Sequence, residues 1–427
     1  MIRKSFADAF DRQGRARYAD ALAASVAVSL PWSTSATAVL AVIWFIVLVP
    51  TLELPTLRSA TRHAAGITPL ILVALAAIGM FWADVSWRER LHGLEGFIKL
   101  LFIPLLLAQF QVSRRGWWVI FGFLGSSIAL LAVSYSLAVR GLAWTGKPIG
   151  VPVKDYMFQS GLFALCAFGL FGFAVELWRC GRTSLALVLA VLGGIFISNI
   201  AFVATSRTTL LIIVVLVIIF GLRHFSAKGI AATGILACFF AGSLWMSSSF
   251  LRERITDVAQ EIQLYRMENV PTSSGLRLEY WKNSIEAVAR APIIGHGTGT
   301  IPELLRLPLS PETGIGHFST NNPHNEIFAV ALQLGLIGTI ILFSMWFVHL
   351  VLFRGEGLIQ WLGLIAVVEN MIGSLLNSHL HDFTQGWLYV FAVGVLGGMT
   401  LRQTEAGDSG TPLKARIAGG AVTNGDG

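Results

Sequence analysis

The chain has 427 residues, of which 55% are hydrophobic and only 13% are charged. Soluble domains carry roughly 25% charged residues, so this composition excludes an ordinary soluble globular protein. The formal charge of +7 does not indicate nucleic-acid binding, because the basic residues are spread over short polar segments rather than gathered in one patch.

Apolar runs of roughly 18 to 25 residues, the length that crosses the hydrocarbon of a bilayer, recur along the chain. They predict an all-α integral membrane protein with about twelve transmembrane helices. The runs lie near residues 18–32, 36–52, 67–83, 94–110, 116–138, 156–178, 184–204, 208–222, 229–247, 323–353, 357–377 and 384–401. Because no A-x-A-like cleavage site follows the basic N-terminus, the first run is interpreted as a retained helix rather than a signal peptide.

An even number of spans puts both termini on one side, and the charges of the short loops indicate which side. The N-terminal tail carries five basic residues, and alternate short loops with the C-terminal tail carry twelve more, whereas the other short loops carry six. Cytoplasmic loops are enriched in Lys and Arg, so we expect both termini in the cytoplasm. The predicted segments are 1–247 with nine helices, a long periplasmic loop at 248–322, three helices at 323–401, and a disordered cytoplasmic tail at 402–427.

Arg207 lies in the very short turn between the seventh and eighth runs, on the side where arginine is disfavoured. An ionisable residue so close to apolar segments usually faces a cavity and finds a counter-charge. No acidic residue is near it in the sequence, and its planar guanidinium suits phosphate oxygens. An anionic ligand and a structural salt bridge to a remote carboxylate are both open interpretations.

The long loop contains a predicted amphipathic helix at about 276–290. Its apolar stripe comprises Leu278, Trp281, Ile285 and Val288. Arg277 falls at the edge of this stripe beside Trp281, where it either holds a ligand at the membrane surface or extends from the interface into water. Pro292 is expected to end the helix, and the glycine-rich segment 295–299 to form a flexible turn.

His324 opens the tenth run. Pro323 suits the first turn of a helix and Asn322 suits its N-cap, so the sequence predicts His324 at the N-terminal end of a membrane helix. The helix dipole there disfavours a protonated imidazole, and a neutral ring is able to act as a general base. A capping or lipid-headgroup contact is the alternative interpretation.

The other polar patterns favour no metal or nucleotide chemistry. His379 and His381 beside Asp382 form only a weak metal-ligand pattern, and the chain has no P-loop, G-x-S-x-G motif or D-x-D pair. We therefore expect no metal and no other cofactor. Two arginines and one histidine on the same membrane face suit a lipid-linked phosphate or diphosphate: the arginines would stabilise a leaving diphosphate and the histidine would deprotonate an attacking hydroxyl.

These segments resemble the O-antigen ligase and O-antigen polymerase superfamily of bacterial envelope proteins. The matching pieces are T-S-R-T-T-L-L at 205–211, R-L-E-Y-W-K at 277–282, A-P-I-I-G-H-G-T-G at 291–299, and N-P-H-N-E-I-F-A-V-A-L-Q-L-G-L-I-G at 322–338. The resemblance implies a GT-C-like membrane fold and a glycosyltransferase that works on the periplasmic face of the inner membrane of a Gram-negative bacterium, without metal or nucleotide sugar.

A ligase of this family moves the O-antigen glycan from undecaprenyl diphosphate onto a sugar hydroxyl of the lipid A–core oligosaccharide. By similarity, Arg207 and Arg277 would bind the donor diphosphate and His324 would activate the acceptor hydroxyl, with inversion of the anomeric centre. Asn322, Asn325 and Trp281 would support them. The implied partners are the undecaprenyl-diphosphate-linked O-antigen, the lipid A–core and membrane lipids, with no nucleic acid.

Two kinds of alternative stay open. Within the superfamily they are the O-antigen polymerase and the protein O-oligosaccharyltransferase; the chain length, the single large loop and the one P-H-N motif favour the ligase. From another class, the alternative is a flippase or transporter for lipid-linked oligosaccharides. Such a protein has less need of a neutral histidine at one interface, and the sequence has no inverted pair of broken helices.

Overall fold

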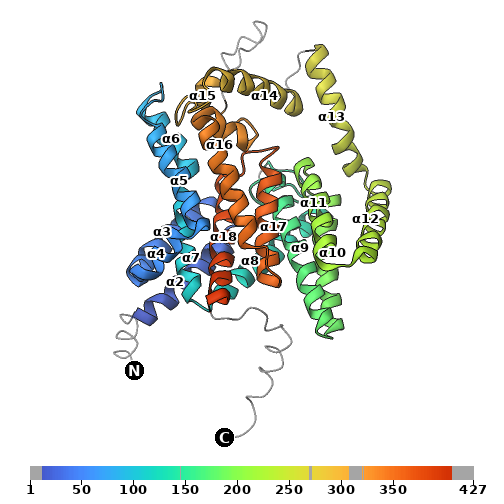
Figure 1. Cartoon of the computed structure of the whole chain (residues 1–427). Coiled ribbons are helices and arrows are strands. Elements are labelled where there is room, and N and C mark those ends of the chain that lie inside the picture. The colour runs from blue at the N-terminus through green and yellow to red at the C-terminus, as the bar shows by residue number, and fades with distance from the viewer. Residues whose placement is uncertain (1–11, 145, 269–271, 307–319, 321, 406–427) are drawn as a thin grey trace.

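Every secondary-structure element among the described residues is a helix (Figure 1). The computed structural model describes residues 12–405 apart from 145, 269–271, 307–319 and 321. Helices satisfy each backbone N–H and C=O within one segment, as a chain in hydrocarbon requires. They are α2 (Arg12–Ser29), α3 (Thr34–Leu48), α4 (Leu54–Arg62), α5 (Ala64–Gly79), α6 (Trp87–Ile98), α7 (Phe102–Val112), α8 (Gly116–Val139), α9 (Tyr156–Arg179), α10 (Thr183–Phe202), α11 (Arg207–His224), α12 (Ala227–Ser247), α13 (Ser249–Glu268), α14 (Ser273–Arg290), α15 (Ile301–Leu304), α16 (Glu326–Leu352), α17 (Leu358–Gly373) and α18 (Phe383–Glu405), with short 3-10 turns at Val49–Thr51 and Lys99–Leu101.

Nine helical segments of the described chain are long and apolar enough to cross a membrane. They are Thr34–Thr51, Trp87–Val112, Gly116–Val139, Tyr156–Arg179, Thr183–Phe202, Arg207–His224, Lys228–Ser247, Glu326–Leu352 and Phe383–Thr404. Together, α4 and α5 make a tenth, bent by 78°. All twelve predicted runs contain a helix, but α2 has charged first turns and α17 has only 16 residues. The structure supports the multi-pass all-α class, and the count of about twelve spans stays a prediction.

The described chain begins and ends at the same end of the bundle (Figure 1). Buried Asp20 of α2 accepts hydrogen bonds from Gln109 Nε2 at 3.0 Å, Ser113 Oγ at 2.7 Å and Arg115 Nη1 at 3.3 Å. Arg402 of α18 donates to the carbonyl oxygen of Ser113 in the same cluster. The predicted disordered tail at 402–427 thus begins inside α18, which continues to Glu405; residues 406–427 lie outside the described residues.

The opposite end of the bundle carries α13, α14 and α15, from the segment predicted as the long loop (Figure 1). The predicted amphipathic helix corresponds to α14, but its buried face is not the predicted stripe. Tyr280, Ser284 and Ala287 are buried, whereas Leu278 and Ile285 are 37% and 59% exposed. The physical reason is close packing: the small side chains of Ser284 and Ala287 let α14 approach its neighbours, and Tyr280 and Ala287 share an apolar cluster with residues of α15 and α16.

The glycine-rich segment 295–299, expected to be a flexible turn, is tightly held. Gly295, Gly297 and Gly299 all have positive φ, and a Cβ on Gly297 would lie 2.5 Å from a backbone atom of Ala83. The segment inserts at a kink of α16, where Gly335 has φ 60°. His296 N donates to the Leu332 carbonyl and Gly297 N to the Gln333 carbonyl, both at 2.9 Å. Glycine is needed here for the backbone conformation and for close approach.

Candidate functional site

The fold brings the three residues singled out from the sequence into one region. Arg207 is the first residue of α11, Arg277 lies in the second turn of α14, and His324 precedes α16. Arg277 interacts electrostatically with both Arg207 and His324, although the three are far apart in the sequence. Each element contributes one functional group, and two of the three groups are cations.

Arg207 has a carboxylate partner from α13. Its Nη1 and Nη2 donate to the two carboxylate oxygens of Glu261 at 3.0 and 2.9 Å. Nη1 also donates to Ser274 Oγ at 2.9 Å, and Nε donates to the Arg254 carbonyl oxygen at 2.8 Å. The hydrogen bonds from Arg207 lower the pKa of Glu261 to about 2, so that carboxylate is ionised at neutral pH. Of the two interpretations left open, the remote salt bridge is present. A guanidinium has five N–H groups, so one is left for a ligand.

Arg277, in contrast, makes no hydrogen bond or ion pair with any described residue. Its side chain is half-buried, and burial is the main reason why its pKa is lowered from the usual arginine value. Its charge is attracted to the Glu261 carboxylate, but that carboxylate is already hydrogen-bonded to Arg207, so a ligand would have to supply a further negative charge. Arg277 is therefore the clearest position in this region for an anionic group.

His324 does not lie in the first turn of α16. The helix begins at Glu326, and its N-cap is Asn325, whose side chain accepts a hydrogen bond from Phe328 N at 3.1 Å. The prediction that Asn322 caps this helix, with Pro323 in its first turn, is wrong. Asn322 Oδ1 instead accepts a hydrogen bond from His324 N at 2.7 Å. This bond supports a left-handed backbone at His324, with φ 53°, which is rare for residues other than glycine and is typical of functional sites.

The imidazole of His324 is held in one orientation by Asn377. Asn377 Oδ1 lies 3.2 Å from His324 Nδ1 and accepts a second hydrogen bond from Asn322 Nδ2 at 3.1 Å. An amide oxygen only accepts, so Nδ1 carries the proton and Nε2 keeps its lone pair. Within the described chain Nε2 has no hydrogen-bond partner. The pKa of His324 is lowered by burial and then by Arg277, while Asn377 raises it, so burial and Arg277 favour the neutral ring.

The supporting residues predicted from the sequence have different roles. Asn322 fixes the turn at His324, and Asn325 caps α16 and also donates from Nδ2 to the Leu375 carbonyl at 2.9 Å. Trp281 lies one turn after Arg277, and its buried Nε1 has no hydrogen-bond partner among the described residues. Sequence reasoning missed Asn377 as a partner of His324. The only available signal was a polar residue in a short segment between two apolar runs, on the same predicted side as His324.

The two histidines that follow Asn377 face different carboxylates. His381 Nδ1 lies 2.5 Å from Glu326 Oε1, and His379 Nδ1 lies 3.7 Å from Glu369 Oε1. Glu326 is fully buried and also accepts a hydrogen bond from Leu380 N at 2.9 Å. Within the part of the chain that the structure describes, no three His, Cys, Asp or Glu residues are arranged to hold a metal ion. The segment 377–382 thus orders the start of α16 and His324.

A family model described as O-antigen ligase matches residues 192–343. The matched stretch runs from α10 into α16 and contains Arg207, Arg277 and His324. Comparison with curated proteins finds no match.

Proposed function

The match at 192–343 supports membership of the O-antigen ligase/polymerase superfamily, a family of glycosyl-transfer enzymes, and from this premise we propose that the chain is an O-antigen ligase. It would move a glycan from undecaprenyl diphosphate onto a sugar hydroxyl of lipid A–core, on the periplasmic face of the inner membrane. One observation carries the proposal: Arg277, which has no hydrogen bond or ion pair among the described residues, interacts with His324, a neutral imidazole whose Nε2 is available to take a proton.

The proposed reaction is a direct displacement. The acceptor hydroxyl oxygen attacks the anomeric carbon, its proton passes to His324 Nε2, and the bond from that carbon to the diphosphate oxygen breaks. Undecaprenyl diphosphate leaves with the bonding electron pair, and the configuration at the anomeric carbon inverts. A general base contributes about 10²- to 10⁴-fold to such a rate. Arg277, with the remaining N–H of Arg207, would stabilise the charge that develops on the leaving diphosphate.

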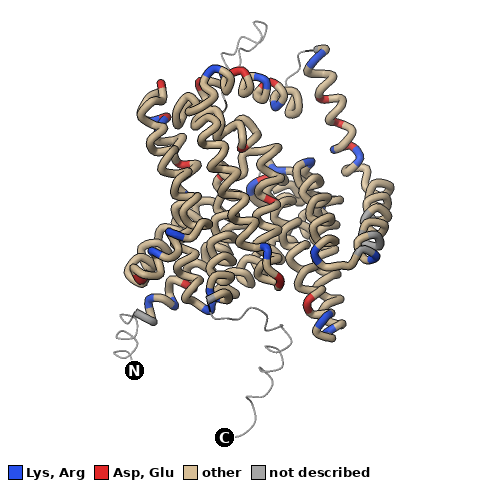
Figure 2. Tube along the Cα trace, viewed as in Figure 1, with Lys and Arg blue, Asp and Glu red and all other residues tan. Residues whose placement is uncertain are grey.

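The membrane orientation in this proposal rests on the distribution of charge. Figure 2 shows Lys and Arg at the end of the bundle where the described chain begins and ends, and a second group on α13 and α14 at the opposite end. The short loops of the first end are the ones rich in basic residues, which favours a cytoplasmic location for them. The candidate site would then face the periplasm, where long loops do not follow the charge rule.

The test is reconstituted transfer with purified protein, undecaprenyl-diphosphate-linked glycan and lipid A–core, with the product followed by gel mobility. Formation of a glycan–lipid A–core product supports the ligase, and its loss in His324→Ala supports the general base. Elongation of the lipid-linked glycan without lipid A–core would instead indicate a polymerase. Movement of the donor across the membrane without any transfer would indicate a flippase. We expect transfer to be unchanged by a chelator, and its loss would overturn the metal-independent mechanism.

A further inference from the structure

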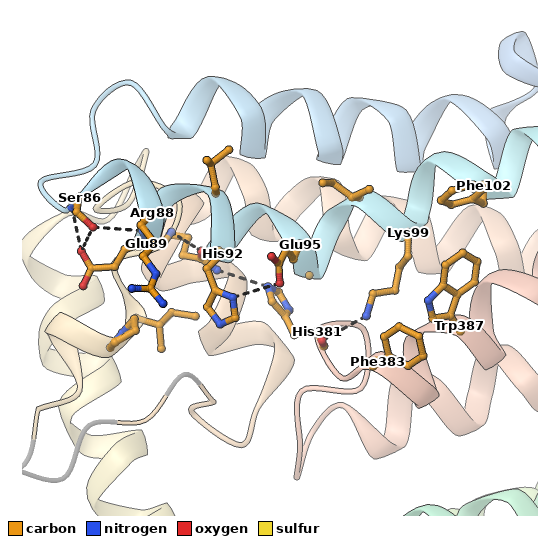
Figure 3. A pocket seen from close by; sticks show the side chains of 18 residues that line it. Ser86, Arg88, Glu89, His92, Glu95, Lys99, Phe102, His381, Phe383 and Trp387 are labelled. Carbon is orange, nitrogen blue, oxygen red and sulfur yellow. Dashed lines mark hydrogen bonds and ion pairs between the residues drawn. The ribbon is translucent and has the colours of Figure 1, made fainter. Parts of the chain in front are cut away.

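A large cavity lies beside the proposed reaction site, with its own set of lining residues. Its volume is about 1340 Å³, and it is bounded by α6, the segment 299–302, α16 and the start of α18 (Figure 3). This exceeds the roughly 300 to 1,000 Å³ of common small-molecule pockets. Arg207, Arg277 and His324 do not line it. The cavity is therefore a second place for a ligand, separate from the region of the two arginines.

The lining of the cavity changes in character along its length. Figure 3 shows Ser86, Arg88 and His92 toward one end, Glu95 and His381 in the middle, and Phe102, Phe383 and Trp387 at the other end, with Lys99 beside these aromatic residues. Trp387 has ring contacts with Phe102 at 5.0 Å and with Phe383 at 6.3 Å between centroids. A polar end and an aromatic end fit an amphipathic molecule whose sugar part and acyl part contact different walls.

The lining of the cavity carries two cations, Arg88 and Lys99, beside the carboxylates of Glu89 and Glu95. Glu89 is occupied by the Ser86 backbone N–H at 2.9 Å and hydroxyl at 2.8 Å, and Glu95 lies 3.1 Å from His92. Arg88 is exposed and has no ion pair within the described residues. Lys99 is only 6% exposed, and its Nζ donates to two carbonyl oxygens, of Asp382 at 2.6 Å and His381 at 3.2 Å. The Lys99 ammonium is also attracted to the carboxylates of Asp382 and Glu326, so Arg88 is the cation of the lining that is open to an anionic ligand.

A single carboxylate connects this cavity with the proposed general base. Glu326 follows His324 by two residues, and its Oε1 lies 2.5 Å from Nδ1 of His381, a residue of the cavity wall. The other nitrogen of His381, Nε2, is 3.5 Å from Gln333 Nε2, which is also in the wall. The cavity and the arginine region therefore meet at the start of α16, while their remaining residues come from different elements.

We propose that this cavity binds the acceptor, a lipid-anchored anionic saccharide. Its acyl part would contact Phe102, Phe383 and Trp387, and its phosphate-bearing sugars would contact Arg88 at the polar end. The inference rests on the proposed function, in which Arg277 and Arg207, outside the lining of the cavity, hold the donor diphosphate. The donor is assigned there because those arginines belong to α11 and α14, and neither helix lines the cavity.

The test is photo-crosslinking in a His324→Ala background, so that binding is measured without turnover. A photoreactive phenylalanine analogue replaces Ile98, which lines the cavity and is 40% exposed; the matched control replaces Leu101, which is 38% exposed and does not line it. The probe is purified lipid A–core in detergent. We expect a crosslink from position 98 and not from 101, competed by unlabelled lipid A–core but not by undecaprenyl diphosphate or phosphatidylglycerol. Equal crosslinking at both positions, or competition by either of those lipids, would overturn the inference.

Kinetics give a second measurement that does not depend on the crosslinker. Ile98→Trp fills part of the cavity, and Arg88→Gln removes an exposed charge; each should raise the KM for lipid A–core about tenfold with the KM for the donor unchanged. Leu101→Trp should change neither value. A raised donor KM would place the donor in the cavity and sink the proposal. Crosslinking needs no turnover. If position 98 gives the specific crosslink but the native protein transfers no glycan, the proposed transfer reaction is wrong and the acceptor site in the cavity still stands.

Discussion

Replacing Asn377 tests whether it fixes the proton and the orientation of His324. Asn377→Leu keeps the approximate size of this buried residue but removes the oxygen that accepts from His324 Nδ1 at 3.2 Å and from Asn322 Nδ2 at 3.1 Å. A neutral hydrogen bond contributes about 1 kcal/mol, so losing two costs about 2 kcal/mol. If that cost falls on the reactive arrangement of the ring, kcat drops about thirtyfold.

The pH dependence separates this positioning role from a merely structural one. In the native protein the pKa of His324 is lowered by burial and Arg277, so a base of this kind loses activity only as the pH falls below the ordinary histidine range. Asn377→Asp keeps an acceptor at the same place but adds a negative charge, which raises the pKa of His324. The variant should be weak at neutral pH and recover as the pH rises.

The assay is lipid A–core transfer at saturating donor, with kcat and kcat/KM measured across pH and thermal unfolding recorded for each variant. A fall in kcat at constant thermal midpoint, with recovery of Asn377→Asp at high pH, supports the reasoning. Full kcat in Asn377→Leu, or a pH profile of Asn377→Asp identical to that of the native protein, would refute it.

Three further changes test the arginine region and the kink of α16. Arg277→Gln should lower kcat/KM about 10²-fold through lost charge stabilisation, while Arg290→Gln, at the exposed end of the same helix, should stay near the native value; equal effects would contradict a specific role. The pKa of Glu261 is lowered from 4.5 to about 2, so the stability from its pairing with Arg207 is fully present above pH 4.5 and is lost as the pH falls toward 2. At such low pH, α13 should become sensitive to protease. Glu261→Gln should make α13 protease-sensitive at neutral pH as well. Gly335→Ala forces alanine into a backbone conformation, φ 60° and ψ −155°, that is nearly restricted to glycine and costs on the order of 1–3 kcal/mol. It also sets a Cβ 2.4 Å from backbone atoms of Ile293, so the thermal midpoint should fall clearly. Gly194→Ala, in open space on α10, is its control and should leave the midpoint unchanged or higher.

The sequence determined the class of the protein and the identity of most of its helices. Apolar runs of bilayer length have few structural solutions, because each must satisfy its own backbone hydrogen bonds in hydrocarbon. The presence of α14 was also predictable, although its buried face is not the apolar stripe that predicted it. The motifs around Arg207, Arg277 and His324 lie within the stretch that the family model matches. These properties depend on short segments of the chain, so they can be predicted from the sequence.

Tertiary structure decided which polar groups meet. Arg207 pairs with Glu261, and His324 pairs with Asn377; the partners are more than fifty residues apart in each case. The spacing of residues along the chain does not predict either pair. The start of α16 was mispredicted because the segment 321–325 offers several asparagines that can cap a helix. The contact of Asn322 with Asn377 assigns it to the turn and leaves the cap to Asn325.

The cavity beside α6 is likewise a product of assembly. Its walls come from segments near residues 90, 300, 333 and 385. The sequence of each segment by itself does not predict a cavity. Burial, charge compensation and the direction of a hydrogen bond depend on distances in space. Those distances are fixed only when the helices pack, which is why the candidate groups were predictable from the sequence and their partners were not.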